Sequence, residues 1–167
     1  MKQTRYIARM GILLALACAV SFLETTLPLP LPLGVKPGLA SIVVMFALLR
    51  LDAKSAWALT ILKSVFVLLT RGVTAGLLSL SGGVLSLCAM LLLLRVLHSS
   101  LLLMSTAGGI AHNLGQLCAS VYLLQNAAAF YTLPILLLAG CIAGIATGIC
   151  LRLFLQALPH MHADFIP

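Results

Sequence analysis

Charged side chains are scarce in this chain of 167 residues, where they make up 8% of the sequence. Only three are acidic, Glu24, Asp52 and Asp164, and they are far apart. Prenyl transfer relies on paired aspartates that hold magnesium and a diphosphate, so this acid content argues against that chemistry. The phosphate-binding pattern Gly-x4-Gly-Lys-Ser/Thr is also missing, which excludes ATP hydrolysis by that route. We therefore expect no enzyme activity and no cofactor.

Cysteine and histidine are too sparse and too scattered to indicate a disulfide framework or a metal centre. The five cysteines are odd in number and widely spaced, so we interpret them as small apolar residues within helices. His160 and His162 give a weak metal signal that is more typical of a solvated tail. No metal site is expected.

Apolar residues dominate instead, at 62% of the chain with a mean hydropathy of +1.20, which is outside the range of soluble domains. Because a helical span needs roughly 20 apolar residues, there is room for about six spans and no separate soluble domain. We expect an all-α fold in which residues 1–167 form one integral membrane domain, a bundle of six transmembrane helices. The predicted helices are 6–23, 38–49, 54–70, 77–97, 101–124 and 131–157.

The basic residues predict the orientation of this bundle, since cytoplasmic loops are rich in lysine and arginine. With six spans and the N-terminus inside, only Lys36 and Arg71 fall on the outer side. Segment 38–49 is short enough to be re-entrant, but five spans would break the charge pattern for every later loop. We predict a multi-pass protein of the cell membrane with a retained first helix and both termini in the cytoplasm. The net charge of +7 is then a topology signal that does not imply nucleic-acid binding. The cytoplasmic set is Lys2, Arg5, Arg9, Arg50, Lys54, Arg95 and Arg152.

Small residues recur at about four-residue spacing in three predicted helices, which lets helix backbones approach closely. In the last helix this pattern favours internal packing. In the first helix, internal packing and docking onto another membrane subunit are equally open. The three sets are Gly140, Gly144 and Gly148 in the last helix; Gly11, Ala15 and Ala19 in the first; and Gly72, Gly76, Ser79, Gly83 and Ser86, which lead into the fourth and continue along one of its faces.

The outer loop 24–38 alternates leucine with proline and therefore cannot be helical. We expect extended polyproline geometry, which is stiff and in this case apolar. Such a segment serves either as a lid across the top of the bundle or as a rigid spacer.

Lys63 lies near the middle of its predicted helix, and Arg71 follows on the same face about 12 Å farther out. A charged side chain in the middle of a membrane is functional by default. Lys63 either forms a permanent ion pair with Glu24 or faces a ligand. Because Lys36, Lys63 and Arg71 outnumber Glu24 in the outer half, the sequence leaves room for an anionic ligand.

A polar stripe interrupts the apolar run 101–124 and should face the interior of the bundle, opposite the serines and glycines of helix 77–97. It indicates either hydrogen bonds between helices, at about 0.6 kcal/mol per contact, or one wall of a ligand site. The polar stripe consists of Gly109, His112, Asn113, Gln116 and Ser120. The opposite, apolar face consists of Ile110, Leu114, Leu117 and Val121.

Segments 24–40, 76–86 and 108–116 resemble those of the Gx transporter family, the substrate-binding (S) components of energy-coupling-factor importers. Members of this family are often labelled heptaprenyl diphosphate synthase component I. The resemblance implies six helices that capture a small molecule at the outer face. The excess of cations points to an anionic molecule, whereas the synthase label points to an isoprenoid or quinone precursor. It also implies a transmembrane coupling subunit and two ATPase subunits as partners in the lipid bilayer.

The resemblance assigns candidate roles to individual residues. Docking onto the coupling subunit would use Gly11, Ala15 and Ala19. Substrate binding would use Glu24, Lys36, Lys63, Arg71, Ser79, Ser86, His112, Asn113 and Gln116. Two alternatives stay open: a noncatalytic membrane subunit associated with heptaprenyl diphosphate synthase, and a stand-alone carrier or channel. The lack of an evident inverted repeat and of proton-relay acids argues against the last.

Overall fold

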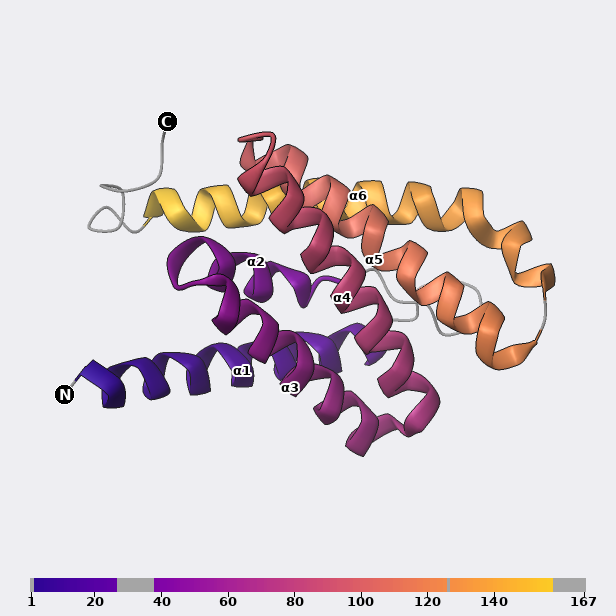
Figure 1. Cartoon of the computed structure of the whole chain (residues 1–167), viewed down its shortest axis with the longest axis horizontal. Helices are drawn as coiled ribbons and strands as arrows, with labels where there is room; N and C mark the ends of the chain where they lie inside the picture. Colours follow the sequence, from indigo (N-terminus) through magenta and orange to yellow (C-terminus); the bar gives the residue numbers. More distant parts are fainter. Residues whose placement is uncertain (1, 27–37, 126, 158–167) are drawn as a thin grey trace.

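The computed structural model describes residues 2–26, 38–125 and 127–157, and within them it is a bundle of helices (Figure 1). This confirms the predicted all-α class and the six helices. They are α1 (Lys2–Thr26), α2 (Ser41–Arg50), α3 (Ala53–Arg71), α4 (Val73–Arg95), α5 (Leu101–Leu124) and α6 (Leu133–Ala157), with a short 3-10 helix, η2 (Ala127–Thr132), before α6. The proline-rich loop, including Lys36, and the tail with His160 and His162 lie outside the described residues.

Helix α4 begins four residues before its predicted start because the turn from α3 is a single residue. Gly72 has a φ of +89°, which a glycine adopts without the steric cost that a Cβ would bring. Its backbone N–H donates to the carbonyl of Leu68 at 3.0 Å and closes α3. Tyr131 belongs to η2, so α6 starts two residues after its predicted start, and α2 starts at Ser41, three residues after its predicted start. Helix α1 is longer than predicted at both ends and extends to Thr26, because the prolines begin only at position 28. The prediction that loop 24–38 contains no helix is therefore wrong for residues 24–26.

Within the described residues, four segments are long and apolar enough to cross a membrane: Thr4–Glu24, Ala53–Arg71, Val73–Arg95 and Ala129–Ala157. Helix α2, with 10 residues, is about 15 Å long and reaches only halfway through a hydrocarbon core. Helix α5 has the length of a span, but its imidazole and amide side chains keep its hydropathy lower. The bundle is therefore a membrane bundle whose central helix, α5, is partly polar.

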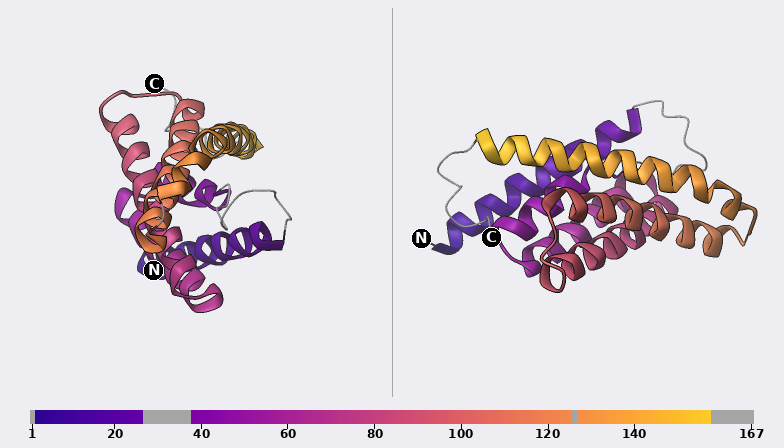
Figure 2. Two further views of the ribbon diagram at one scale, coloured as in Figure 1. Left: turned by 90° about the vertical axis from the view of Figure 1, so that its right-hand side faces the viewer. Right: turned by 90° about the horizontal axis from the view of Figure 1, so that it is seen from above.

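Helix α5 packs extensively against both α4 and α6, and α4 also packs against α3. Helix α1 packs mainly against α3 and α2, and the short α2 lies between α1 and α6 (Figures 1 and 2). Most side chains of α1 are exposed as a result.

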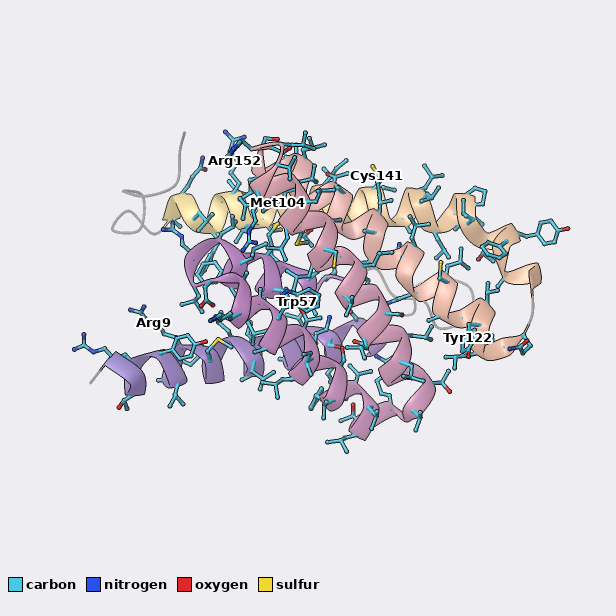
Figure 3. All side chains as sticks on the ribbon, in the orientation of Figure 1. Arg9, Trp57, Met104, Tyr122, Cys141 and Arg152 are labelled. Atoms are coloured by element: carbon cyan, nitrogen blue, oxygen red, sulfur yellow. The ribbon has the colours of Figure 1, made fainter. Side chains whose placement is uncertain are left out.

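The start of α1 and the end of α6 lie at the same end of the bundle (Figure 2). Arg9 and Arg152 mark this end, whereas Tyr122 marks the opposite one (Figure 3). Because successive helices run in alternate directions, Arg50, Lys54 and Arg95 also belong to the first end, which we call the basic end. This separation agrees with the charge pattern of the sequence, and the cytoplasmic location of the basic end stays a prediction.

The main apolar core lies toward the basic end, where α2 meets the start of α3 and the ends of α4 and α6. A smaller apolar cluster joins α5, η2 and α6 near the opposite end. The main core contains Val44, Met45, Ala47, Leu48, Leu49, Ala56, Leu59, Leu87, Met90, Met104 and Leu151. The smaller cluster contains Leu117, Ala129 and Leu136.

The glycines of α6 pack directly against α5, as the sequence predicts. A Cβ added at Gly144 would lie 2.6 Å from the Cα of Thr106, and one added at Gly140 would lie 2.8 Å from the carbonyl oxygen of Gly109. Ser105 and Thr147 join the same two helices by a hydroxyl hydrogen bond of 2.8 Å. Small residues thus bring α5 and α6 into backbone contact.

Candidate functional site

A cavity of about 260 Å³ opens at the end of the bundle opposite the basic end. Four helices contribute to its wall, and Gly38, just before α2, completes it. The lining is unusually polar for the interior of a membrane protein, with two cations, one acid, an imidazole, an amide and three hydroxyls. It consists of Ser21, Glu24, Gly38, Lys63, Val67, Arg71, Thr74, Ala75, Leu78, Ser79, His112 and Gln116.

Among these groups, burial of Lys63 costs the most free energy, because its charged side chain is only 3% exposed. The negative charge of Glu24 acts on it. The ammonium nevertheless makes no hydrogen bond or close ion pair to any residue in the described ranges 2–26, 38–125 and 127–157. Within this part of the chain, Lys63 therefore faces the cavity without a direct partner.

Glu24 joins the end of α1 to the start of α2. Its Oε1 accepts a hydrogen bond of 3.2 Å from the backbone N–H of Ala40, and the side chain is 6% exposed. Its charge acts on Arg71 as well as on Lys63. Among the described lining residues, the one acid is thus held in place near the two cations Lys63 and Arg71.

His112 and Gln116 lie one turn apart on α5 and form a buried pair. Nε2 of Gln116 donates to Nε2 of His112 at 2.8 Å. Since an amide nitrogen can only donate, this imidazole nitrogen is the acceptor and the ring is neutral, with its proton on Nδ1. Nδ1 has no hydrogen bond of ordinary geometry within the described part of the chain.

The imidazole ring is wedged against Gly38, which requires glycine on two grounds. Gly38 has a φ of +74°, and a Cβ there would lie 2.5 Å from Cδ2 of His112. The backbone of Gly82 on α4 also lies against the ring. These contacts fix the position of His112 in the cavity wall.

Hydroxyl groups from α1 and α4 complete the polar lining. Ser79 on α4 is half-buried, and its Oγ accepts from Oγ of Ser64 at 3.4 Å. Ser21 on α1 is buried one turn before Glu24. Together with Gln116, these groups offer hydrogen bonds to a polar molecule in the cavity.

Of the nine residues predicted to bind substrate, six line this one cavity: Glu24, Lys63, Arg71, Ser79, His112 and Gln116. Lys36 lies outside the described residues. The other two, Ser86 and Asn113, are buried but are not part of the lining.

Asn113 and Ser86 lie between helices. Nδ2 of Asn113 donates to the backbone carbonyl of Leu136 on α6 at 2.8 Å. One residue along a helix turns the side chain by about 100°, which directs Asn113 away from the cavity side occupied by His112. Ser86 lies two turns along α4 from Ser79, close to Gly108 of α5. Both side chains are therefore placed at helix interfaces.

Two polar lining residues, Ser21 and Thr74, escaped the sequence reasoning. Ser21 is one helical turn from Glu24 on the same face of α1, and this spacing is a signal that the sequence contains. Thr74 follows Arg71 by three residues, but it faces the cavity only because α4 starts directly after Gly72. No pattern in the sequence indicates so short a turn.

The three small residues of α1 lie outside this site and are all exposed. A Cβ added at Gly11 would have no atom within 4 Å. The stripe therefore lies on the exposed surface of α1.

Comparison of the sequence with known proteins assigns the chain to a family. No curated protein matches the chain, and no solved structure matches it. The sequence model of one protein family, described as heptaprenyl diphosphate synthase component I, matches residues 13–154. The match extends from α1 into α6 and includes every residue that lines the cavity. The chain therefore belongs to the heptaprenyl diphosphate synthase component I family, which confirms the family resemblance of the sequence.

Proposed function

We propose that the chain is the substrate-binding subunit of an energy-coupling-factor importer and captures a small anionic molecule in the cavity. The observation that carries the proposal is Lys63, a buried ammonium that faces the cavity and has no direct partner among the described residues. A buried charge is tolerated when an opposite charge or hydrogen bonds compensate for its lost hydration. A bound anion would supply that compensation.

The other lining groups suit a small polar ligand. Arg71 provides a second positive charge, and Ser79 and Gln116 provide hydrogen-bonding groups. A cavity of about 260 Å³ suits a compact molecule.

Energy for uptake would come from partners, a transmembrane coupling subunit and two ATPase subunits. The exposed stripe of Gly11, Ala15 and Ala19 supports a docking role for α1, because small residues let another helix approach its backbone closely. With this division of labour the chain needs no catalytic residues of its own. The ligand would enter from the outer side and the basic end would face the cytoplasm.

Co-isolation from membranes tests the docking face. We expect the purified chain to carry a coupling subunit with it, and Ala15→Leu or Ala19→Leu to reduce recovery of that subunit by adding bulk to the contact. Ala146→Leu adds the same bulk to an exposed position of α6 and should leave recovery unchanged. Equal recovery with all three variants would contradict docking through α1.

Mass spectrometry of small molecules that remain bound through purification tests the ligand. An anionic compound should accompany the native chain and should be lost in Lys63→Met and His112→Ala, provided that both variants elute as folded protein. Intact retention in both would return these two residues to a structural role.

A second candidate is a noncatalytic membrane subunit of heptaprenyl diphosphate synthase, and the description of the family favours it. The same co-isolation experiment separates the two. Recovery of a prenyl diphosphate synthase, without a coupling subunit, would replace the import proposal by this one.

A further inference from the structure

We propose that the ligand carries a short apolar group next to its anionic group, and that an apolar strip on one wall of the cavity selects this group. The strip consists of Leu78, Val67 and Ala75. This inference rests on the proposed function in one respect, that an anion binds Lys63 in the cavity. It adds specificity-determining residues and a narrower class of ligand, a short amphiphilic anion.

The order of these residues along the cavity follows from the contacts between α3 and α4, which are joined by a single-residue turn and run in opposite directions. Ser64 lies level with Ser79, since their hydroxyl oxygens are 3.4 Å apart. Leu68 lies level with Gly76, where an added Cβ would be 2.5 Å from the Cβ of Leu68. Each residue outward along α3 therefore matches one residue back along α4, and lining residues of both helices can be placed at a common depth.

This register divides the described lining of α3 and α4 into three levels. Lys63 and Ser79 form the base. Leu78, Val67 and Ala75 follow in that order toward the opening, and Thr74 and Arg71 come last. At a rise of about 1.5 Å per residue, Val67 lies about 6 Å and Arg71 about 12 Å outward from Lys63 along the helix. The strip thus begins directly outside the buried lysine.

Exposure agrees with these levels. Lys63 is 3% exposed and Val67 is 2% exposed, and the rest of the strip is half-buried. Arg71 and Thr74 at the opening are exposed. The α3 and α4 side of the cavity therefore offers a cation at depth, apolar surface next to it, and polar groups again at the opening.

An apolar strip in this place favours a ligand that covers it and is thereby removed from water. Each methylene group buried against the strip should tighten binding about fourfold. An extended chain advances about 1.2 Å per bond, so about five bonds from the anionic group reach the depth of Val67. The gain should therefore continue to chains of about six carbons and end where the chain reaches the exposed Thr74 and Arg71.

Straight-chain carboxylates are suitable probes, because they share one anionic group and differ only in apolar length. In calorimetric titrations of the purified full chain, the dissociation constant should fall about 15-fold from acetate to butanoate and again from butanoate to hexanoate. The step from hexanoate to octanoate should be smaller than about fourfold, since the added carbons lie at the opening. Lys63→Met should abolish binding of every probe.

Val67→Thr tests the strip with little change in side-chain size. The threonine hydroxyl can donate to the backbone carbonyl one turn earlier, which keeps the helix intact, but it places a polar atom beside the ligand chain. The ratio of the dissociation constants of acetate and hexanoate should fall at least about fivefold. Val65→Thr is the matched control, because it makes the same exchange at a position of α3 that is 46% exposed and outside the lining. Its ratio should equal that of the native chain.

Ala75→Leu gives an independent measurement if Val67→Thr does not fold. It adds bulk at the outer end of the strip and should weaken hexanoate binding at least about tenfold more than acetate binding. Ala146→Leu adds the same bulk to an exposed position of α6 and should leave both unchanged.

Three results would overturn the inference: dissociation constants that do not fall from acetate to hexanoate, equal changes in Val67→Thr and Val65→Thr, or no binding of any probe. Equal losses of both probes in Ala75→Leu, or native binding in Lys63→Met, would also overturn it. Failure of the import proposal looks different. If affinity rises with chain length as expected but no coupling subunit co-isolates, the importer role fails and the role of the strip stands. If the coupling subunit co-isolates and affinity does not rise with chain length, only the role of the strip fails.

Discussion

The sign of the change in unfolding free energy in Lys63→Met shows whether the charge of Lys63 serves ligand binding or stabilises the fold. Methionine matches the lysine stem in length and removes the charge. If Lys63 binds a ligand, its buried ammonium is uncompensated in the ligand-free protein and destabilises it, so the variant should be more stable. If Lys63 is half of a structural ion pair, the variant removes that pair and should be less stable.

The structure allows both outcomes to be estimated. A lysine near the centre of a span costs about 2.5–3.5 kcal/mol, and the nearby charge of Glu24 offsets part of this. We therefore expect Lys63→Met to gain about 1–3 kcal/mol, whereas breaking a buried ion pair would lose about 3–5 kcal/mol. For a chain of 167 residues, 1 kcal/mol changes the melting temperature by about 2–4 °C. The expected rise is about 2–12 °C.

Thermal unfolding of the purified, ligand-free chain in detergent measures this shift. Lys54→Met, on the same helix but exposed at the basic end, is the control and should change stability by less than about 0.5 kcal/mol. Lys63→Met should also abolish binding of small anions. A lower melting temperature in Lys63→Met, with no change in Lys54→Met, would refute the argument from an uncompensated charge.

Three further predictions concern packing, the site boundary and pH. Gly144→Ala places a Cβ 2.6 Å from the backbone of Thr106 and should lower the free energy of unfolding, measured by denaturant titration, by about 1–3 kcal/mol. In the control Gly11→Ala the new Cβ meets no atom within 4 Å, so the free energy of unfolding should stay the same or rise by up to about 1 kcal/mol. Equal effects of the two substitutions would contradict the close contact between α5 and α6. Asn113→Ala should lose about 0.6–1.7 kcal/mol of stability and keep ligand binding, and loss of binding in the folded variant would return Asn113 to the site. Hydrogen bonds from Ser55 hold the pKa of Asp52 below its usual range. Its ionised form therefore stabilises the fold above a pH of about 3.9, and this contribution is lost as the pH falls through the lower folded pKa. Asp52→Asn should flatten the acid side of the melting temperature profile against pH, and an unchanged profile would contradict this role.

The sequence predicted the helices well where capping residues and apolar runs coincide. Ser100 ends a short polar loop, and its Oγ accepts from the N–H of Leu103, so α5 has the predicted bounds. Asp52 caps α3 in the same way, one residue from the predicted start. The start of α4 was missed because Gly72 alone makes the turn, and a helical pattern does not show where a positive φ interrupts it.

The candidate site was predictable to the extent that helix periodicity assigns faces. His112 and Gln116 share a face of α5 and line the cavity together. Asn113 lies on the edge of that stripe and contacts α6, because α5 is covered by α4 on one side and α6 on the other. Periodicity gives the width of a buried stripe, but the choice of neighbour for each residue depends on tertiary packing.

The polar character of α5 also bears on the order in which the protein enters the membrane. A helix that presents an imidazole and two amides to lipid is a poor substrate for the translocon on its own, since each unsatisfied group costs several kcal/mol. Helix α4 covers the face of His112, and the carbonyl that receives the amide of Asn113 belongs to Leu136 on α6. We therefore expect α5 to be held beside α4 during synthesis and to settle in the bilayer only after α6 has emerged. Biogenesis of the cavity is then completed by the last helix, which contributes no residue to its lining.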